Sequence, residues 1–314
     1  MHNRRSLSTL MIKDINVSDE YFRISRNAVS DDLLRSVREY GILQSPVLLK
    51  TGSGECRIID GFNRLKAASL AGIDRVEAHV SDRIELQEFI ANAVVKSYHN
   101  ELGPAGKMKV LFVMKDYFNA SMTECLHTGT AGLGIPRDFI STSPDIQGVF
   151  RLPQVVREYF DARDLSFKII KYFLRLPEQA QGIMAQWLCH VQLRVNVFKK
   201  AVEMIQDIYR RDGTVAWMEK INPTLIDDPR GSENYILEAL HRIRYPEYAS
   251  LWADVEVLLD SMKGQDLEIK FPEFFEGDAI SVVLKIRRDE TYADIKKKMQ
   301  KIDQDSFDKL LRFL

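Results

Sequence analysis

The chain has 314 residues, of which 45% are hydrophobic, so it is long enough for two or three domains with cores of their own. A formal net charge of −1 excludes a protein coated with basic surface, and any contact with nucleic acid must therefore be local. No apolar run suits a signal peptide or a membrane span, which predicts a cytoplasmic protein without membrane partners. The wide spacing and apolar surroundings of Cys56, Cys125 and Cys189 predict buried thiols, with neither disulfides nor a metal site.

The first hundred residues alternate between short apolar strands and amphipathic helices, which predicts a mixed α/β domain. We expect a first strand within residues 11–17, and then a helix that Ser30 caps and Gly41 ends. A strand at residues 47–49 and a hairpin turn at residues 51–55 follow.

The segment over residues 57–80 combines a buried strand, a tight turn at Gly61, a helix that Gly72 stops and a further strand. A glycine at a strand-to-helix turn lets backbone N–H groups approach an anion, and the helix N-terminus adds partial positive charge. Arg64 and Lys66 lie in the first turn of this helix, so the segment predicts a phosphate-binding turn. The same residues also suit an ordinary strand-turn-helix unit in which Arg64 is a surface side chain.

The order of these segments resembles the N-terminal domain of the ParB family of partition proteins, which is shared distantly with sulfiredoxins and with ParB-related serine kinases. Residues 31–50 (DDLLRSVREYGILQSPVLLK) resemble the family's helix and strand, which meet at Gly-x-Leu-Gln-x-Pro. Residues 57–80 (RIIDGFNRLKAASLAGIDRVEAHV) follow, and residues 100–104 (NELGP) stand where the family ends its third motif. Residues 150–188, which begin FRLPQVVREYF, resemble its helical middle segment. The resemblance covers roughly half of the chain.

The resemblance implies a nucleotide site, with CTP, ATP or ADP together with magnesium as the ligand. In the family, the polar loop before the first helix contributes an arginine that faces the nucleotide, which here is Arg23 or Arg26. The further residues that the resemblance places at the nucleotide or its phosphates are Gln44, Gly61, Phe62, Asn63, Arg64, Lys66, Lys96 and His99.

The chain departs from the family in two motifs. Where the family has a Gly-Glu-Arg-Arg turn, this chain keeps only the glycine and the last arginine. The family's Glu-Asn pair, which helps to hold magnesium, is replaced here by Val95 and Lys96. Because this change removes hard oxygen ligands, a ParB-style CTP switch is in doubt and no metal ligand is assigned. Lys96 either supplies the missing positive charge to a phosphate or is a solvated helix lysine. Sulfiredoxin chemistry is not expected, because none of residues 60–64 is a cysteine.

Asp19 and Glu20, two acids in the polar loop before the first helix, are candidate catalytic residues. ParB-related serine kinases are understood to use a carboxylate in this region as a base on the substrate hydroxyl, which is what phosphoryl transfer needs. The other interpretation is that both are ordinary exposed loop residues.

From residue 104 the pattern is helical, and Pro104 suits the first turn of a helix. The resemblance places a helix-turn-helix over residues 123–143, but Pro144 falls where a recognition helix would run. Because proline inside a helix costs about 3 kcal/mol, either a helix begins after it or the segment is a loop. Acidic and basic residues are equally numerous over residues 105–165, which is poor support for binding a polyanion.

Basic residues outnumber acidic ones over residues 166–211, and this is where contact with DNA phosphates is expected. The candidate DNA-binding residues are Lys168, Lys171, Arg175 and Arg137. The other interpretation is a solvated helix face, because the apolar residues of this segment also follow helical spacing.

Residues 222–234 concentrate Pro, Gly, Asp and Asn and predict a linker to a C-terminal unit. That unit should contain helices near residues 235–244 and 247–262, strands near 267–271 and 279–287, and a helix near 292–302. Its order resembles the C-terminal part of ParB proteins, which dimerise by pairing strands, so we expect a homodimer through this unit.

The fold predicted is α/β plus α. It comprises a ParB/sulfiredoxin-like mixed α/β domain (1–103), a helical middle domain related to helix-turn-helix domains (104–221) and a small α+β unit (222–314). The leading functional hypothesis is a DNA-associated partition-type or regulatory protein with a phosphate-binding turn at residues 60–66. One alternative is a nucleotide-dependent phosphotransferase, and another is a ParB-derived protein-binding regulator without nucleotide activity.

Overall fold

The computed structural model describes residues 6–26, 29–51, 55–141, 143–226, 228–262, 267–272, 279–300 and 302–314. The chain divides into two compact units. The first comprises Met1–Gln206 and Thr214–Glu233, and the second comprises Asp207–Gly213 and Asn234–Leu314. The predicted division into three domains, at residues 103 and 221, stays a prediction.

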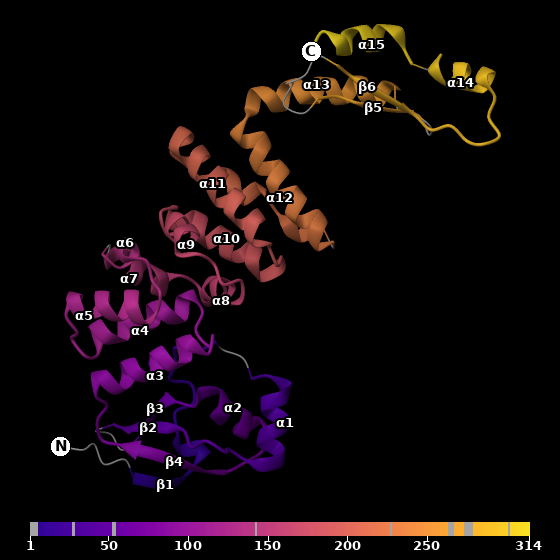
Figure 1. The fold of residues 1–314 in the computed structure, drawn as a ribbon. Coiled ribbons are helices and arrows are strands. Elements are labelled where there is room, and N and C mark those ends of the chain that lie inside the picture. Colours follow the sequence, from indigo (N-terminus) through magenta and orange to yellow (C-terminus); the bar gives the residue numbers. More distant parts are fainter. Residues whose placement is uncertain are drawn as a thin grey trace. The chain divides into compact units, whose positions relative to one another are not determined.

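A mixed four-stranded sheet begins the first unit, in the order β1-β4-β2-β3 (Figure 1). Its strands are β1 (Ser6–Met11), β2 (Val47–Lys50), β3 (Cys56–Asp60) and β4 (Arg75–Ser81). β4 pairs antiparallel with β1 and parallel with β2, and β2 pairs antiparallel with β3. The hairpin turn expected between β2 and β3 falls largely on residues 52–54, outside the described residues.

The first strand lies earlier in the chain than predicted. β1 ends at Met11, a short 3-10 helix follows over Ile12–Asp14, and Ile15 forms only an isolated bridge with Cys56. β1 is an edge strand with no buried residue, so it carries little of the apolar alternation that marks a strand in sequence.

The helices of this α/β part begin and end at local signals. They are α1 (Asp31–Tyr40), α2 (Phe62–Leu70) and α3 (Leu86–Tyr98). The N–H of Leu33 donates to Oγ of Ser30 at 3.1 Å, which confirms the predicted cap. Gly41 and Gly72 follow the ends of α1 and α2 with φ of +72° and +75°, as expected of glycines that stop helices.

A helical part completes the first unit, so the α/β plus helical layout is confirmed. Its helices are α4 (Pro104–Asp116), α5 (Met122–His127), a π-helical turn (Thr128–Gly132), α6 (Arg137–Ile140), α7 (Ser143–Arg151), α8 (Gln154–Ala162), α9 (Phe167–Leu174), α10 (Glu178–His190) and the greater part of α11 (Val195–Asp212), whose last residues belong to the second unit. α4 begins at Pro104 as predicted. α7 begins at Ser143, so Pro144 lies in a first turn, where its missing N–H leaves no helical bond unmade, and the loop alternative is wrong.

The second unit is built from helices and a hairpin. Its elements are the greater part of α12 (Pro229–Arg244), α13 (Pro246–Met262), β5 (Leu267–Lys270), β6 (Ser281–Leu284), α14 (Tyr292–Met299) and α15 (Gln304–Leu311). β5 and β6 pair antiparallel, and Val255, Met262, Phe271 and Leu310 form the core. The turn expected between the strands lies mostly outside the described residues, and α15 was not predicted.

The predicted linker is wrong from residue 229 onward, because α12 begins there. Ser232 and Glu233 are 2% and 3% exposed, and the Glu233 carboxylate accepts hydrogen bonds from the backbone N and Nε of Arg194, both at 2.6 Å. These tertiary contacts stabilise a helix where the composition suggests a loop.

The three cysteines differ in their exposure to solvent. Cys125 is buried and Cys56 is half-buried, but Cys189 is exposed, so the prediction of buried thiols is wrong for Cys189. Burial raises the pKa of the Cys125 thiol.

Across the described residues, no helix combines the length and the apolar character needed to cross a bilayer.

Candidate functional site

The turn between β3 and α2 consists of one residue, Gly61, whose φ is +96°. A Cβ at this position would lie 2.7 Å from Cβ of Pro46. Left-handed backbone and this close approach both require glycine, whether or not a ligand binds. Gly61 therefore has a structural role that does not depend on phosphate.

Asp60, the last residue of β3, binds two cations. Its Oδ2 lies 2.8 Å from Nη2 of Arg64 in α2, and its Oδ1 lies 2.9 Å from Nζ of Lys96 in α3. Burial raises the pKa of the Asp60 carboxyl, but Lys96, Arg64 and the Gly61 N–H together outweigh burial and hold that pKa below its ordinary value. Lys96 is 15% exposed in its side chain, so the interpretation as a solvated helix lysine is wrong.

These residues line a pocket of about 540 Å³. The predicted site residues on its wall are Arg26, Gln44, Gly61, Phe62, Asn63, Arg64, Lys96 and His99. The structure adds lining residues that were not named as ligand-binding residues from the sequence, namely Ser25, Leu33, Asp60, Asn92, Val95 and Glu101. Among these, Asp60 was detectable, because its spacing of four residues from Arg64 is typical of an ion pair.

Two of the predicted nucleotide-binding residues lie outside this pocket. Lys66 is exposed on α2 and does not line it, because two residues along a helix turn the side chain roughly 200° away from Arg64. Arg23 lines a neighbouring pocket and donates from Nη2 to Oδ1 of Asn63 at 2.7 Å. Of the two candidate arginines, Arg26 therefore lines the pocket and Arg23 positions Asn63.

Asp19 and Glu20 are both held by arginines. Asp19 lies 2.5 Å from Nε of Arg57, and Glu20 lies 2.6 Å from Nη1 of Arg23. Neither acid lines the pocket at Gly61. Their roles as bases stay predictions, and a reaction at that pocket would require them to act from outside it.

The donor set at Gly61 does not fit magnesium. Val95 and Lys96 replace oxygen ligands, and both Asp60 oxygens are already bound by cations. Over the described ranges, His, Cys, Asp and Glu side chains form no group of three or more that would hold a metal ion. Lys96 brings a positive charge to the wall of this pocket.

Three of the four predicted DNA-binding residues come together on α9 and at Arg175, which caps its C-terminus. Lys168, Lys171 and Arg175 line a second pocket, of about 430 Å³, with Asp138 on its wall. Nζ of Lys171 lies 3.4 Å from Oδ2 of Asp138, which partly compensates its charge. Arg137 is exposed at the start of α6, beside Asp138 in sequence, but it does not line this pocket.

No family model matches the chain. The chain is 25% identical over 182 residues to a probable chromosome-partitioning protein ParB of Neisseria meningitidis, which covers 57% of this chain and 61% of the relative. It is 26% identical over 174 residues to a protein of the same description from Treponema pallidum, over 55% of this chain and 51% of that one. The chain therefore matches between half and two thirds of the length of these relatives.

A solved structure similar to the chain is the C-terminally truncated chromosome-partitioning protein ParB of Caulobacter crescentus, complexed to the centromeric parS site. It is 18% identical with a TM-score of 0.27, and the match covers 62% of this chain and 97% of that one.

Proposed function

We propose that the chain is a ParB-like protein that binds DNA as a partition-type or regulatory protein and holds a phosphate-bearing nucleotide at the Gly61 turn. The observation that carries the nucleotide part is the convergence of Arg64 and Lys96 on the single carboxylate of Asp60. Nζ of Lys96 also lies 3.3 Å from Oε2 of Glu101. With Arg26, the wall therefore has three cations against two acids, which leaves an excess of one positive charge.

An anion in this pocket would meet three kinds of donor. The first turn of α2 leaves backbone N–H groups without helical partners, and the helix dipole places partial positive charge there. Arg64 and Lys96 provide side-chain cations, and Asp60 orients both before any ligand arrives. The exposed Arg26 adds a third cation at the wall. Phosphate oxygens accept hydrogen bonds from all three kinds of donor.

The nucleotide would bind without a protein-held metal ion. CTP, ATP and ADP all present phosphates, and Lys96 supplies the charge that magnesium would otherwise bring. The family's magnesium-dependent form of binding is not proposed, because the oxygen ligands are missing.

The DNA part of the proposal rests on Lys168, Lys171 and Arg175. They form a local cluster on a chain of nearly neutral net charge, as a limited set of phosphate contacts requires. Nζ of Lys168 and Cζ of Arg175 lie 6.0 and 5.9 Å from the ring centre of Tyr172, which supports both side chains at the surface. Arg137 would add a further contact from α6.

Homodimerisation through the C-terminal hairpin belongs to the same proposal. Val282 and Val283 in β6 are 38% and 43% exposed, and Ile286 just beyond it is 54% exposed. Apolar side chains along a two-stranded sheet favour pairing with another chain.

One observation favours a different function. Because Asp60 already pairs with both cations, the pocket is stable without a ligand, as a ParB-derived protein-binding regulator without nucleotide activity would require. The phosphotransferase alternative is less favoured, because Asp19 and Glu20 lie outside the pocket and are paired with arginines.

The test is calorimetric titration of the full chain with CTP, ATP and ADP, each with and without magnesium. We expect binding of at least one nucleotide with little dependence on magnesium. Arg64→Ala should weaken it at least tenfold, whereas Lys66→Ala, an exposed lysine on the same helix, should leave it unchanged. If Arg64→Ala binds every nucleotide as tightly as the unmutated chain, the site is wrongly assigned.

The pattern of binding also separates the alternatives. A strict magnesium requirement for CTP would restore the family's switch. A preference for ATP or ADP would favour the phosphotransferase, and binding of none of them would favour the regulator.

A further inference from the structure

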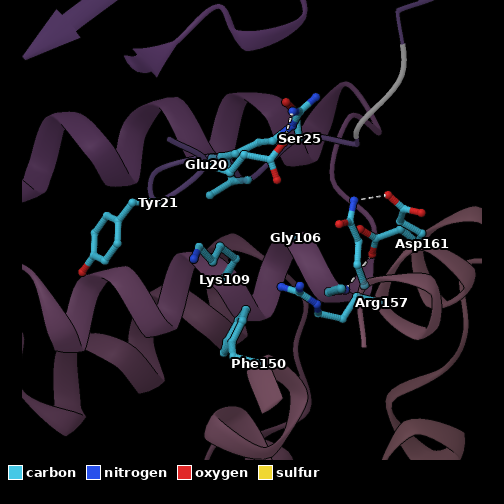
Figure 2. A pocket seen from close by; sticks show the side chains of 13 residues that line it. Glu20, Tyr21, Ser25, Gly106, Lys109, Phe150, Arg157 and Asp161 are labelled. Carbon is cyan, nitrogen blue, oxygen red and sulfur yellow. Dashed lines mark hydrogen bonds and ion pairs between the residues drawn. The ribbon is translucent and has the colours of Figure 1, made fainter. Parts of the chain in front are cut away.

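A third pocket, distinct from those at Gly61 and at Lys168, lies between the loop before α1 and helices α4, α7 and α8, and its volume is about 430 Å³. Figure 2 shows Lys109 of α4 and Arg157 of α8 extending into the same space, with Phe150 of α7 beside them. It shares only Ser25 with the pocket at Gly61. Neither Lys109 nor Arg157 has a role in the function proposed above.

Lys109 is a half-buried cation surrounded by aromatic rings. Its Nζ lies 5.3 Å from the ring centre of Tyr21, 5.1 Å from that of Phe112 and 5.2 Å from that of Phe150. Ring faces attract a cation but provide no counter-charge. Within the described part of the chain, Lys109 forms no ion pair.

The surroundings disfavour the charged form of Lys109. Burial lowers the pKa of the Lys109 ammonium, and the nearby guanidinium of Arg157 lowers it further. The carboxylates of Asp116, Asp19 and Glu20 raise the pKa of Lys109, but their effect does not outweigh that of burial and Arg157. An anion between Lys109 and Arg157 would relieve this repulsion.

Arg157 has a polar atom without an acceptor. Its Nε is buried and has no hydrogen-bond partner among the described residues. A buried donor left unsatisfied costs roughly 1–3 kcal/mol, and such groups are rare in native proteins. A bound oxygen atom would satisfy it.

The acids on the wall of this pocket are each bound to another group. Glu20 pairs with Arg23 at 2.6 Å, and Glu158 accepts from Nε2 of Gln154 at 2.7 Å. Asp161 accepts from the backbone N–H of Ala105 at 2.7 Å. Among the described residues, none of these carboxylates forms an ion pair with Lys109 or Arg157.

We infer that this pocket is an anion site in which Lys109 and Arg157 bind a phosphate group. A guanidinium provides a planar set of donors and an ammonium a compact charge, and a tetrahedral phosphate dianion has oxygens enough for both. The volume accommodates inorganic phosphate or the phosphate end of a nucleotide. The two sources share the same chemistry and are separated by experiment.

The experiment is titration of the full chain with inorganic phosphate, followed by ³¹P NMR and calorimetry in a buffer free of other oxyanions. Lys109→Met and Arg157→Gln should each weaken phosphate binding at least tenfold. Lys107→Met, on the same helix but outside the pocket, should leave it unchanged. Arg64→Ala should also leave it unchanged, because Arg64 belongs to the other pocket.

Titration of Arg64→Ala with CTP identifies the source. If Arg64→Ala still binds CTP and the further substitution Lys109→Met abolishes that binding, the phosphate belongs to a nucleotide. If Arg64→Ala responds to inorganic phosphate but not to CTP, the site binds the free ion. Both results support the site. Phosphate binding that survives Lys109→Met and Arg157→Gln, or that Arg64→Ala alone removes, overturns it, as does the absence of binding at millimolar phosphate.

A measurement on the unmutated chain covers the case in which Lys109→Met does not fold. Phosphate should protect Lys109 from an amine-reactive reagent, with Lys107 as the internal reference in peptide mass spectrometry. Equal modification of Lys109 with and without phosphate contradicts the site.

Discussion

The carboxylate of Asp161 in α8 accepts a hydrogen bond from the backbone N–H of Ala105 at the start of α4, at 2.7 Å. Two helices that begin 50 residues apart are thereby joined by a side chain that satisfies an otherwise unpaired helix N-terminus. A Cβ at Gly103 would lie 2.3 Å from Oδ1 of Asp161, so glycine is needed for this approach.

The first prediction concerns the protonation of Asp161. Burial raises its pKa to about 6, although the N–H groups of Ala105 and Gly106 lower it. Because the folded pKa lies above the unfolded value of about 4, the folded state binds more protons, and this group adds stability as the pH falls from about 6 to 4. Asp161→Asn should stabilise the protein at pH 7 by roughly 1–3 kcal/mol, since the amide oxygen still accepts the bond. Urea unfolding at pH 7 and pH 5 measures this, and a gain that is as large at pH 5 would contradict it.

The second prediction concerns Asp60. Asp60→Asn should cost roughly 2–4 kcal/mol at pH 7, because Arg64 and Lys96 lose their shared carboxylate in a half-buried site. Its depressed pKa means that this stability is present above about pH 4 and is lost as the pH falls through the folded pKa. Urea unfolding of both proteins from pH 7 to pH 3 should show the difference between them shrinking at the acid end.

The same substitution has an opposite effect on binding. Asp60→Asn removes the negative charge that both cations share, while Lys96 keeps its ion pair with Glu101 and Arg64 keeps its hydrogen bond to the Gln44 carbonyl. Any nucleotide bound at Gly61 should therefore bind more tightly, by about tenfold for about 1.4 kcal/mol of relieved competition. Calorimetry on the folded variant measures this. Weaker binding would mean that Asp60 contacts the ligand or that its orientation of Arg64 outweighs its competition.

The third prediction compares two glycines with left-handed backbone. Gly61→Ala should cost roughly 2–4 kcal/mol, because a Cβ there meets Cβ of Pro46 at 2.7 Å in addition to the backbone strain. Gly72→Ala is the matched control, since its Cβ would meet no atom within 4 Å and should cost only about 1 kcal/mol of strain. Urea midpoints of the two variants provide the comparison. Equal losses would show that the contact with Pro46 relaxes freely.

The fourth prediction concerns DNA. Lys168→Glu and Lys171→Glu together should weaken binding to duplex DNA at least tenfold, and the slope of log affinity against log salt should fall by roughly 2. Lys200→Glu, on the exposed face of α11, is the control for net charge, although it changes one charge and not two. Fluorescence anisotropy with a labelled duplex at several salt concentrations measures both quantities. Identical slopes for all three proteins would remove α9 from the interface.

Elements that carry local signals were predictable from the sequence. Ser30, Gly41 and Pro104 mark helix ends through their own capping groups or backbone preferences, so their positions follow from a few neighbouring residues. β1 was placed wrongly, because an edge strand needs no buried alternation. The start of α12 is predicted too late in the chain, because the contact that stabilises its first turns, between Glu233 and Arg194, joins residues 39 positions apart.

The sequence by itself determined the strand-turn-helix at Gly61 and the types of charged residue around it, since glycine, periodicity and capping act over one or two turns of chain. Only the tertiary structure decided which of those charges meet. It brought Lys96 to Asp60, left Lys66 exposed, and placed Lys109 beside Arg157. The physical reason is that charges interact through distance in space and through burial, and neither leaves a periodic pattern along the chain.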